Sequence, residues 1–423
     1  MTKMALHWKI MIALVLAIIC GTVTGTDMAI FGVSFYQVYD FVGTLFLNAL
    51  MMIIVPLIMA SIITGISSMG SGSDLGRLGL KTIGFYAFSS SMAILIGLFF
   101  VNLLTPGIAN GLAVGESLNL TLDSNQVASA VASVEGRGGG DIVQIFLRMI
   151  PTNIVAAAAE GQMLGLIFFS LVFGYFMMQI QGTYSESLVN LWQGISETMM
   201  KIKMWIMSFA LYGVFGLVAE TVASTGFSAF RPLLWFFFTV LLALAVHTFV
   251  ALPLLLKTVG KVSPKAHFRA MAPAMLTAFS SASSSATLPL TMESVEKNVG
   301  VSERTTSFVL PLGATINMDG TALYECVAAI FLAQAYGLEM SFVTQFTVVL
   351  IALLTSIGVA GIPAASLVAI TVILTAIGLP VEAIGLLLVT DRILDMCRTA
   401  VNIFSDSCGA VLIARSEGEQ LMI

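Results

Sequence analysis

The sequence predicts an all-α polytopic membrane protein with eight transmembrane helices and two re-entrant helical hairpins. Composition, the length of the apolar runs and a pair of interrupted apolar segments support this fold class. Of the 423 residues, 58% are hydrophobic and 10% are charged, whereas a soluble domain carries about 25% charged residues. A chain with so few charges cannot cover a soluble surface, so its predicted partner is the lipid bilayer of the cell membrane. The net charge of −5 is small and spread out, which does not suggest nucleic-acid binding.

Six apolar runs are long enough to cross a bilayer, because one helical crossing needs about 20 residues. They lie near 8–26, 36–67, 76–104, 142–181, 189–222 and 227–257. Lys3 and Lys9 precede the first run without a secretory cleavage site, so this run is predicted to be a span. The polar stretch 106–140 ends in a glycine-rich segment and is predicted to be an external loop.

Two further apolar segments, 263–297 and 341–378, are interrupted at their centres by the tips SSASSS (280–285) and GVAGIPAAS (358–366). Short interrupted segments in corresponding positions are typical of transporters. Irregular backbone at membrane depth is tolerated only beside protein or water. Each hairpin precedes a long helix, 303–336 or 382–415, so the pattern predicts an internal inverted repeat of hairpin plus helix.

Basic residues indicate the topology. Six of them surround the base of the first hairpin: Lys257, Lys261, Lys265, Arg269, Lys297 and Arg304. The connections around the second hairpin, 336–341 and 378–384, contain no Lys or Arg. By the positive-inside rule, the first hairpin enters from the cytoplasm, the second enters from outside, and both termini are cytoplasmic.

One helical stripe near the C-terminus carries five polar residues, Asp391, Asp395, Arg398, Asn402 and Asp406. At about 100° per residue they share one face of the helix. A charge at the bilayer centre costs at least about 2.5–3.5 kcal/mol, so the stripe predicts a charged cargo or bound ions.

Within this stripe, Arg398 can hold a carboxylate bidentately, and Asp395 can pair with an ammonium group. Together they describe a receptor for a zwitterion that carries an extra acid. The alternative is a self-paired Asp–Arg network that only holds helices together. Three acids against one arginine favour bound cations.

Three other motifs carry chemistry. Asn317 and Asp319 interrupt an apolar helix, and the freed oxygens suit Na⁺, although a simple kink is the alternative. The serine tip offers hydroxyls and N–H groups to a carboxylate, or is only a turn of small residues. A serine nucleophile is disfavoured, because no G-x-S-x-G surrounds it and the chain has three histidines. Glu325, one turn beyond Thr321, can exchange a proton or pair with an arginine.

Four long motifs resemble the dicarboxylate/amino acid:cation symporters, a family that includes archaeal aspartate transporters and mammalian excitatory glutamate transporters. They are TINMDGTALYE (315–325), SSASSSATLP (280–289), SIGVAGIP (356–363) and LDMCRTAVNIFSDSCGA (394–410). The resemblance covers nearly the whole chain. It implies a glutamate-transporter fold, a homotrimer and an elevator mechanism. The scaffold would be 1–75 and 141–222, and the transport domain 76–105 and 223–423.

The resemblance also implies ligands. The side-chain carboxylate of the substrate would meet Arg398, its ammonium Asp395, and its main-chain carboxylate Asn402 and the first tip. The implied substrate-binding residues are Ser283, Ser284, Met318, Thr321, Ala360, Gly361, Ile362, Pro363, Asp395, Arg398, Thr399 and Asn402.

Three Na⁺ sites are implied in the same way. The first would use Asp406 with carbonyls of Gly313, Asn317 and Asn402. The second would use Thr315 with carbonyls of Ser356, Ile357 and Val359. The third would use Asp319 and Asn317 with Tyr86, Ser89 and Ser90.

Some positions depart from the family pattern. Ala282 stands where archaeal members carry an arginine, and Met396 where the mammalian transporters carry one. This chain has Arg392 instead, and neither Arg392 nor Asp391 receives a role. Glu325 matches the mammalian pattern, where that acid is linked to proton coupling. The sequence leaves open whether K⁺ is counter-transported.

The leading hypothesis is Na⁺-coupled uptake of L-glutamate and L-aspartate, with or without a proton carried by Glu325. The alternative is a C4-dicarboxylate:cation symporter, which Asp395 disfavours because its carboxylate repels a substrate without an ammonium group. An ion channel is a third hypothesis. An enzyme is the least favoured, because no base accompanies the serines.

Overall fold

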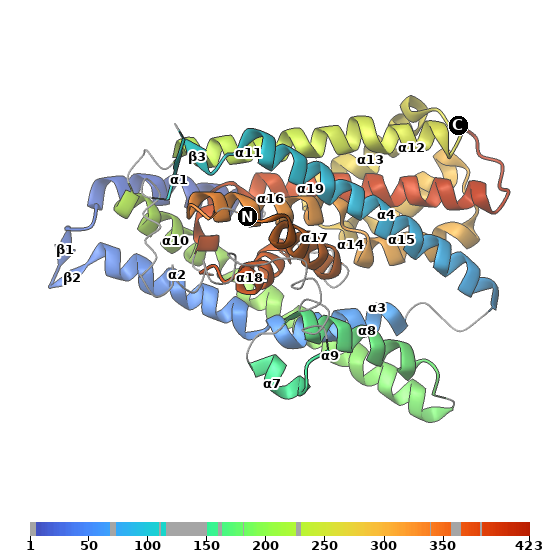
Figure 1. Ribbon diagram of the computed structural model, residues 1–423, viewed down its shortest axis with the longest axis horizontal. Helices are drawn as coiled ribbons and strands as arrows, with labels where there is room; N and C mark the ends of the chain where they lie inside the picture. Colours follow the sequence, from blue (N-terminus) through green and yellow to red (C-terminus); the bar gives the residue numbers. More distant parts are fainter. Residues whose placement is uncertain are drawn as a thin grey trace, which may run out of the picture.

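The computed structural model is dominated by helices (Figure 1). It describes residues 6–67, 73–109, 111–115, 150–159, 163–180, 182–225, 230–338, 340–356, 365–380 and 383–423. It also contains two small antiparallel pairs, β1 (Ala29–Ile30) with β2 (Val33–Ser34), and β3 (Ile108–Ala109) with β4 (Leu112–Ala113). The structure is mostly helical, in agreement with the predicted class, and these two pairs are its only strands among the described residues. Phe31 and Gly32 both have positive φ, which suits a tight two-residue hairpin turn.

Helices from the first half of the chain pack in two groups. Helix α10 (Ala210–Thr225) packs against α1 (Leu6–Thr24) and α2 (Phe35–Met52). Helix α3 (Ile54–Ser67) packs against α8 (Met163–Met177) and α9 (Thr183–Ser208). A short helix, α7 (Ile154–Ala159), precedes α8.

The predicted spans 36–67 and 189–222 are not single straight helices. The run 36–67 divides into α2 and α3 around Ile53. The run 189–222 falls in α9 and α10, which bend by 57°. The bend lies at Phe209, where two i→i+3 backbone hydrogen bonds, Phe209–Ile206 and Tyr212–Phe209, replace the α-helical pattern. Hydrophobic length alone does not reveal such a tightened turn.

The remaining helices surround α16 (Asp319–Ala335) and α19 (Ile384–Ser416), which contact each other. Almost every residue of α16 is buried. Their neighbours include α4 (Ser73–Leu104), α11 (Phe230–Val246), α13 (Pro264–Ser281), α15 (Glu303–Ile316), α17 (Phe342–Ser356) and α18 (Ala365–Ile377). The main hydrophobic core includes residues of this central pair and extends to α1, α2 and α10.

Helix α11 continues through a π-helical turn, η3 (His247–Ala251), into α12 (Leu252–Thr258). A π-turn inserts one extra residue and rotates the side chains that follow it, and such turns are frequent at functional sites. Among the described residues, three helical segments are long and apolar enough to cross a membrane: Arg77–Leu104, Arg231–Thr258 and Glu303–Ala335, the last of which contains the break between α15 and α16. The bent pair α9 and α10 makes a fourth if it is one span.

The first predicted hairpin consists of α13, α14 (Ser284–Ser294) and a π-helical turn, η4 (Val295–Val299). Ser263 and Ser283 cap α13 and α14, because each hydroxyl accepts an N–H bond from the first turn. Ala282 reverses the chain in the left-handed region, with φ of 50°. The second predicted hairpin corresponds to α17 and α18, and most of its tip, 357–364, lies outside the described residues.

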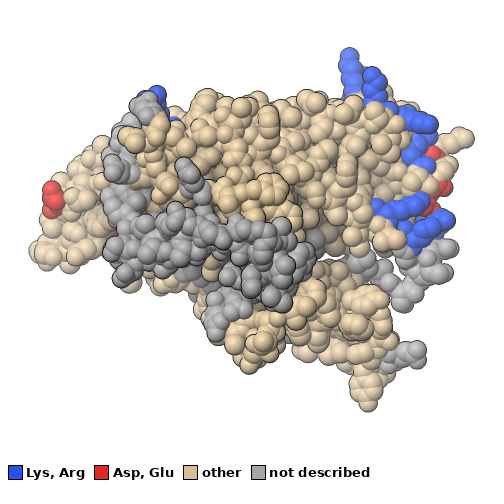
Figure 2. Space-filling model, in the orientation of Figure 1, with Lys and Arg blue, Asp and Glu red and all other residues tan. Residues whose placement is uncertain are grey.

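Basic side chains gather at one end of the molecule, where α4 begins and α19 ends (Figure 2). The C-terminal segment crosses this end. Glu417 pairs with Arg77 at 2.6 Å and with Lys81 at 2.5 Å. Glu419 accepts hydrogen bonds from the backbone N–H of Ser302 at 2.8 Å and from its hydroxyl at 2.7 Å, at the start of α15. The segment therefore joins the ends of α4, α15 and α19.

The Glu417→Gln substitution should loosen the start of α4. Hydrogen bonds from Lys81 and Arg77 lower the pKa of Glu417, so these contacts stabilise the fold above the ordinary glutamate pKa of about 4.3. They are lost as the pH falls through the lowered value. Hydrogen exchange at neutral pH should become faster in residues 73–81 of the variant.

A matched control is Glu293→Gln. Glu293 pairs with Lys297 at 2.8 Å, and both residues lie in the first hairpin, so the pair does not involve α4. This variant should leave residues 73–81 unchanged. Equal exchange rates in the wild type and in Glu417→Gln would show that the segment does not fasten α4.

Candidate functional site

The break between α15 and α16 is the centre of the candidate site. Asn317 and Met318 leave the helical conformation, with φ, ψ of −97°, 90° and −117°, 58°. The first N–H groups of α16 therefore need partners from elsewhere. The stripe residue Asn402 supplies one, because its Oδ1 accepts from the Gly320 N–H at 2.8 Å. Its Nδ2 donates to Thr321 Oγ1 at 3.1 Å.

Gly320 allows α16 to lie directly against α19. A Cβ atom added at Gly320 would lie 2.7 Å from the carbonyl oxygen of Arg398 and 3.0 Å from its Cα. Both atoms belong to the backbone of α19, so they cannot move aside independently. The broken helix therefore requires glycine at this position.

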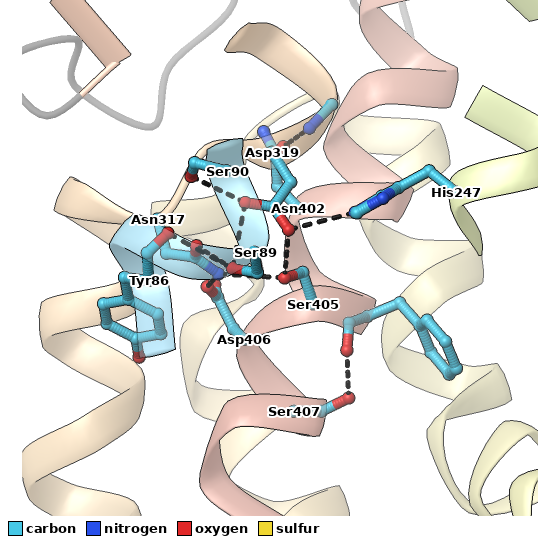
Figure 3. Close-up of polar contacts among 12 residues, drawn as sticks. Tyr86, Ser89, Ser90, His247, Asn317, Asp319, Asn402, Ser405, Asp406 and Ser407 are labelled. Carbon is cyan, nitrogen blue, oxygen red and sulfur yellow. Dashed lines mark hydrogen bonds and ion pairs between the residues drawn. The ribbon is translucent and has the colours of Figure 1, made fainter. Parts of the chain in front are cut away.

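Asp319 is fully buried, and four side chains surround its carboxylate (Figure 3). Ser90 and Ser89 donate to Oδ1 at 2.7 and 3.2 Å. Ser405 donates to Oδ2 at 2.6 Å, and His247 Nε2 lies 3.0 Å from the same oxygen. These partners come from α4, α19 and η3, so one carboxylate ties three elements to the broken helix.

The amide of Asn317 links Asp319 to the second buried acid, Asp406 (Figure 3). Asn317 Nδ2 donates to Asp406 Oδ1 at 2.9 Å and to Ser405 Oγ at 3.1 Å. Its Oδ1 accepts from Ser89 at 3.2 Å.

Tyr86 and Gly313 border the same group. The Tyr86 hydroxyl donates to the Val309 carbonyl at 2.7 Å. A Cβ atom at Gly313 would lie 2.6 Å from both that hydroxyl and Asp406 Oδ1.

Asp319 and Asp406 share this polar group without a lysine or arginine partner among the described residues. We call the group of Tyr86, Ser89, Ser90, Asn317, Asp319, Ser405 and Asp406 the acidic cluster. Buried charge needs compensation, and a cation held by hydroxyl, amide and carboxylate oxygens would supply it. In the part of the chain that the structure describes, no three His, Cys, Asp or Glu side chains form a metal-binding group.

Arg398 forms a second, separate group of charges. Its side chain is fully buried, and Nη2 lies 2.9 Å from Asp391 Oδ1 and 3.0 Å from Asp395 Oδ1. Nη1 donates to Ser366 Oγ at 2.8 Å, and the guanidinium carbon lies 3.9 Å from the centre of the Tyr324 ring. The structure thus contains the self-paired network that the sequence left as an alternative, and Asp391 supports Arg398 directly.

Arg392 belongs to this second group. Its Nη1 lies 3.7 Å from Asp395 Oδ2. The predicted balance of three acids against one arginine is based on the stripe alone. It leaves out Arg392. It also includes Asp406, which contacts Asn317 and belongs to the acidic cluster. Asp391, Asp395, Arg392 and Arg398 form a group of two acids and two arginines, which we call the neutral quartet.

Other predicted residues lie elsewhere. Glu325 is fully buried, and its Oε2 accepts from Thr355 at 3.1 Å. Thr399 donates to the Asp395 carbonyl at 2.8 Å. Thr315 is exposed and donates to the Leu312 carbonyl at 2.9 Å.

The structure gives few contacts for the predicted residues of the two hairpin tips. Ser283 accepts from the Ala286 N–H at 3.2 Å, and Ser284 is buried at the start of α14. The predicted residues Ile357, Val359, Ala360, Gly361, Ile362 and Pro363 lie outside the described residues, next to Ser356 at the end of α17.

Sequence reasoning missed four contacting residues: His247, Ser405, Tyr324 and Ser366. A histidine inside an apolar run of this length was a usable signal, because it is costly there without a polar partner. Ser405 lies beside Asp406 in the sequence. Nothing in the spacing of Tyr324 or Ser366 indicated a contact with Arg398.

Apolar helices that enclose buried ionisable groups at the break of a helix define a multi-pass membrane transporter. Residues 6–416 match the sodium:dicarboxylate symporter family. The chain belongs to this family, whose members are transporters and not enzymes.

Named relatives align along almost the whole chain. It is 35% identical to the proton/glutamate-aspartate symporter of Escherichia coli K12, over 98% of this chain and 93% of the relative. It is 33% identical to the proton/sodium-glutamate symport protein of Geobacillus stearothermophilus, over 99% and 96% of the two chains. It is also 33% identical to excitatory amino acid transporter 3 of Mus musculus, over 98% and 86%.

The Gly320→Ala substitution should separate α16 from α19, because the new methyl group would overlap the backbone at Arg398. Such overpacking costs about 1–3 kcal/mol, so the thermal midpoint of the purified protein should fall. Gly84→Ala is the control, since a Cβ at Gly84 meets no atom within 4 Å. Equal thermal midpoints for Gly320→Ala and Gly84→Ala would contradict the close contact.

Proposed function

We propose that this protein is a secondary active symporter that imports L-glutamate and L-aspartate, coupled to Na⁺ and H⁺. The observation that carries the proposal is the fully buried Arg398, held beside Asp395 and next to the break between α15 and α16. The names of two relatives support it. One is a proton/glutamate-aspartate symporter, and the other is a proton/sodium-glutamate symport protein.

The two ends of an acidic amino acid suit different members of the site. The Arg398 guanidinium would hold the side-chain carboxylate, with Asp391 and Ser366 fixing its plane. The Asp395 carboxylate would bind the ammonium group. Asn402 and the first tip, at Ser283 and Ser284, would bind the main-chain carboxylate, and the other substrate contacts would be those predicted from the resemblance. A C4-dicarboxylate lacks the ammonium group that Asp395 requires.

The acidic cluster is the proposed place for Na⁺. One ion would bind Asp319 and Asn317 with Tyr86, Ser89 and Ser90, which already meet in the structure. A second would bind Asp406 with carbonyls of Gly313, Asn317 and Asn402. A third would bind Thr315 with the carbonyls at 356, 357 and 359. Na⁺ would offset the negative charges of Asp319 and Asp406. Because Asp319 begins α16 and Asn402 contacts the next two residues, Na⁺ and substrate would stabilise the same arrangement of the break.

The packing of the helices suggests how the site moves. The groups around α10 and α3 would form a scaffold within a homotrimer. The helices around α16 and α19 would form a transport domain that carries both clusters as one body, as an elevator. The basic end shown in Figure 2 would face the cytoplasm, together with both termini.

Uptake into proteoliposomes tests the assignment. The wild type should accumulate labelled L-aspartate in a Na⁺-dependent manner, and succinate should compete weakly. Arg398→Ala should lose at least about tenfold in kcat/KM, because a hydrogen bond to a charged group contributes about 1.5–3 kcal/mol.

Arg398→Lys is the matched control for folding. It keeps the charge beside Asp391 and Asp395 but lacks the planar fork, so the protein should fold and still transport aspartate poorly. Absence of Na⁺-dependent aspartate uptake by the wild type would refute the function. An unchanged KM in Arg398→Lys would refute the role of the guanidinium.

The Glu325→Gln substitution tests proton coupling. A glutamine fills the same space and can still accept from Thr355, but it cannot release a proton. Aspartate uptake should persist while proton entry, followed with a pH-sensitive dye inside the vesicles, disappears. Proton entry that continues in step with aspartate in this variant would assign coupling to another group.

A further inference from the structure

Arg392 is a buried charge that the proposed binding of substrate and Na⁺ does not use. Its side chain is only 8% exposed. Its Nε is buried without a hydrogen-bond partner among the residues that the structure describes. A guanidinium stays charged even in such surroundings, and a buried charge is costly unless another charge compensates it. The compensating group here is Asp395.

The two oxygens of Asp395 are divided between two arginines. Oδ1 lies 3.0 Å from Arg398 Nη2, within hydrogen-bond distance. Oδ2 lies 3.7 Å from Arg392 Nη1, which is beyond a hydrogen bond but close enough for strong attraction between the charges. Arg398 is also fastened by Asp391 and Ser366. Arg392 is therefore the partner of Asp395 that an incoming cationic group can replace most easily.

We propose that Arg392 is an internal counter-cation, which occupies the ammonium position of Asp395 in the empty carrier and gives way when an amino acid binds. This inference rests on the proposed function, because it assigns the ammonium of the substrate to Asp395. In the empty state the neutral quartet carries no net charge. Without Arg392 it would carry one uncompensated negative charge.

This arrangement has opposite effects on two steps of transport. Arg392 competes with the substrate ammonium for Asp395, so it weakens substrate binding. It also removes one negative charge that would otherwise cross the membrane with the empty site, where an isolated charge is expensive. It therefore speeds the return of the empty carrier. Exchange of internal for external substrate avoids the empty state and does not depend on this return.

The experiment compares net uptake with exchange in the same proteoliposomes. Net uptake is measured with labelled L-aspartate outside and a Na⁺ gradient. Exchange is measured with unlabelled L-aspartate also inside. Arg392→Gln should lower the KM for aspartate about two- to fivefold, as expected for the loss of one competing ion pair. It should slow net uptake relative to exchange by a similar factor.

Three further variants separate charge from structure. Arg392→Lys restores a cation and should recover both the wild-type KM and the wild-type ratio of net uptake to exchange. Arg392→Met keeps apolar volume without a charge or an unpaired donor, so it replaces Arg392→Gln if that protein does not fold. Arg304→Gln removes an exposed arginine at the start of α15 and should match the wild type.

The possible results are distinct. An unchanged KM and an unchanged ratio in a folded Arg392→Gln or Arg392→Met protein would overturn the counter-cation. Equal losses of net uptake and exchange, without recovery in Arg392→Lys, would also overturn it and leave Arg392 a structural residue. If the wild type itself transports no aspartate in either assay, the proposed function fails instead.

Discussion

The contact between the broken helix α15–α16 and the unbroken helix α19 is the constraint on which the site depends. A helix interrupted in an apolar interior exposes N–H and carbonyl groups that water cannot reach, and each needs a partner. Helix α19 supplies one such partner through Asn402, which accepts from the Gly320 N–H, while Ser405 and Asp406 accept from the side-chain amide of Asn317 at the break. It can do so only because Gly320 lets the two backbones meet. The polar stripe on α19 is thus a structural requirement of the break as well as a set of ligands.

The charged residues of the stripe belong to two separate groups that differ in net charge. The acidic cluster holds two carboxylates and no arginine or lysine among the described residues, so it favours added cations. The neutral quartet holds two carboxylates and two arginines, so it is balanced before anything binds. Asn402 and the start of α16 lie between the two groups. Cation binding and substrate binding at the proposed sites would therefore act on the same short piece of backbone.

The sequence predicted those features that follow from local pattern. The periodicity from Asp391 to Asp406 placed five polar groups on one face, and the Asn317–Gly320 motif located the break, because both signals are contained in a single helix. Features that depend on tertiary register escaped prediction. His247 reaches Asp319 from η3, where a π-turn changes the helical register in a way that no spacing rule anticipates. The bend at Phe209 leaves no trace in the hydrophobic length of the run. The pairing of Arg392 with Asp395, by contrast, lies within α19 at a spacing of three residues and is a local signal, although the predicted stripe omits Arg392.

The polar groups proposed to bind the substrate already have partners in the structure. Asp395 contacts both arginines, and Asn402 contacts Gly320 and Thr321. An acidic amino acid that binds as proposed would exchange existing contacts for its own, and the gain in free energy would be the difference between the two sets. A carrier needs its polar groups to be paired before substrate binds, because unpaired polar groups would make the empty site too costly to move through the membrane. The same exchange would limit affinity, so that the substrate could leave once the site opened on the other side.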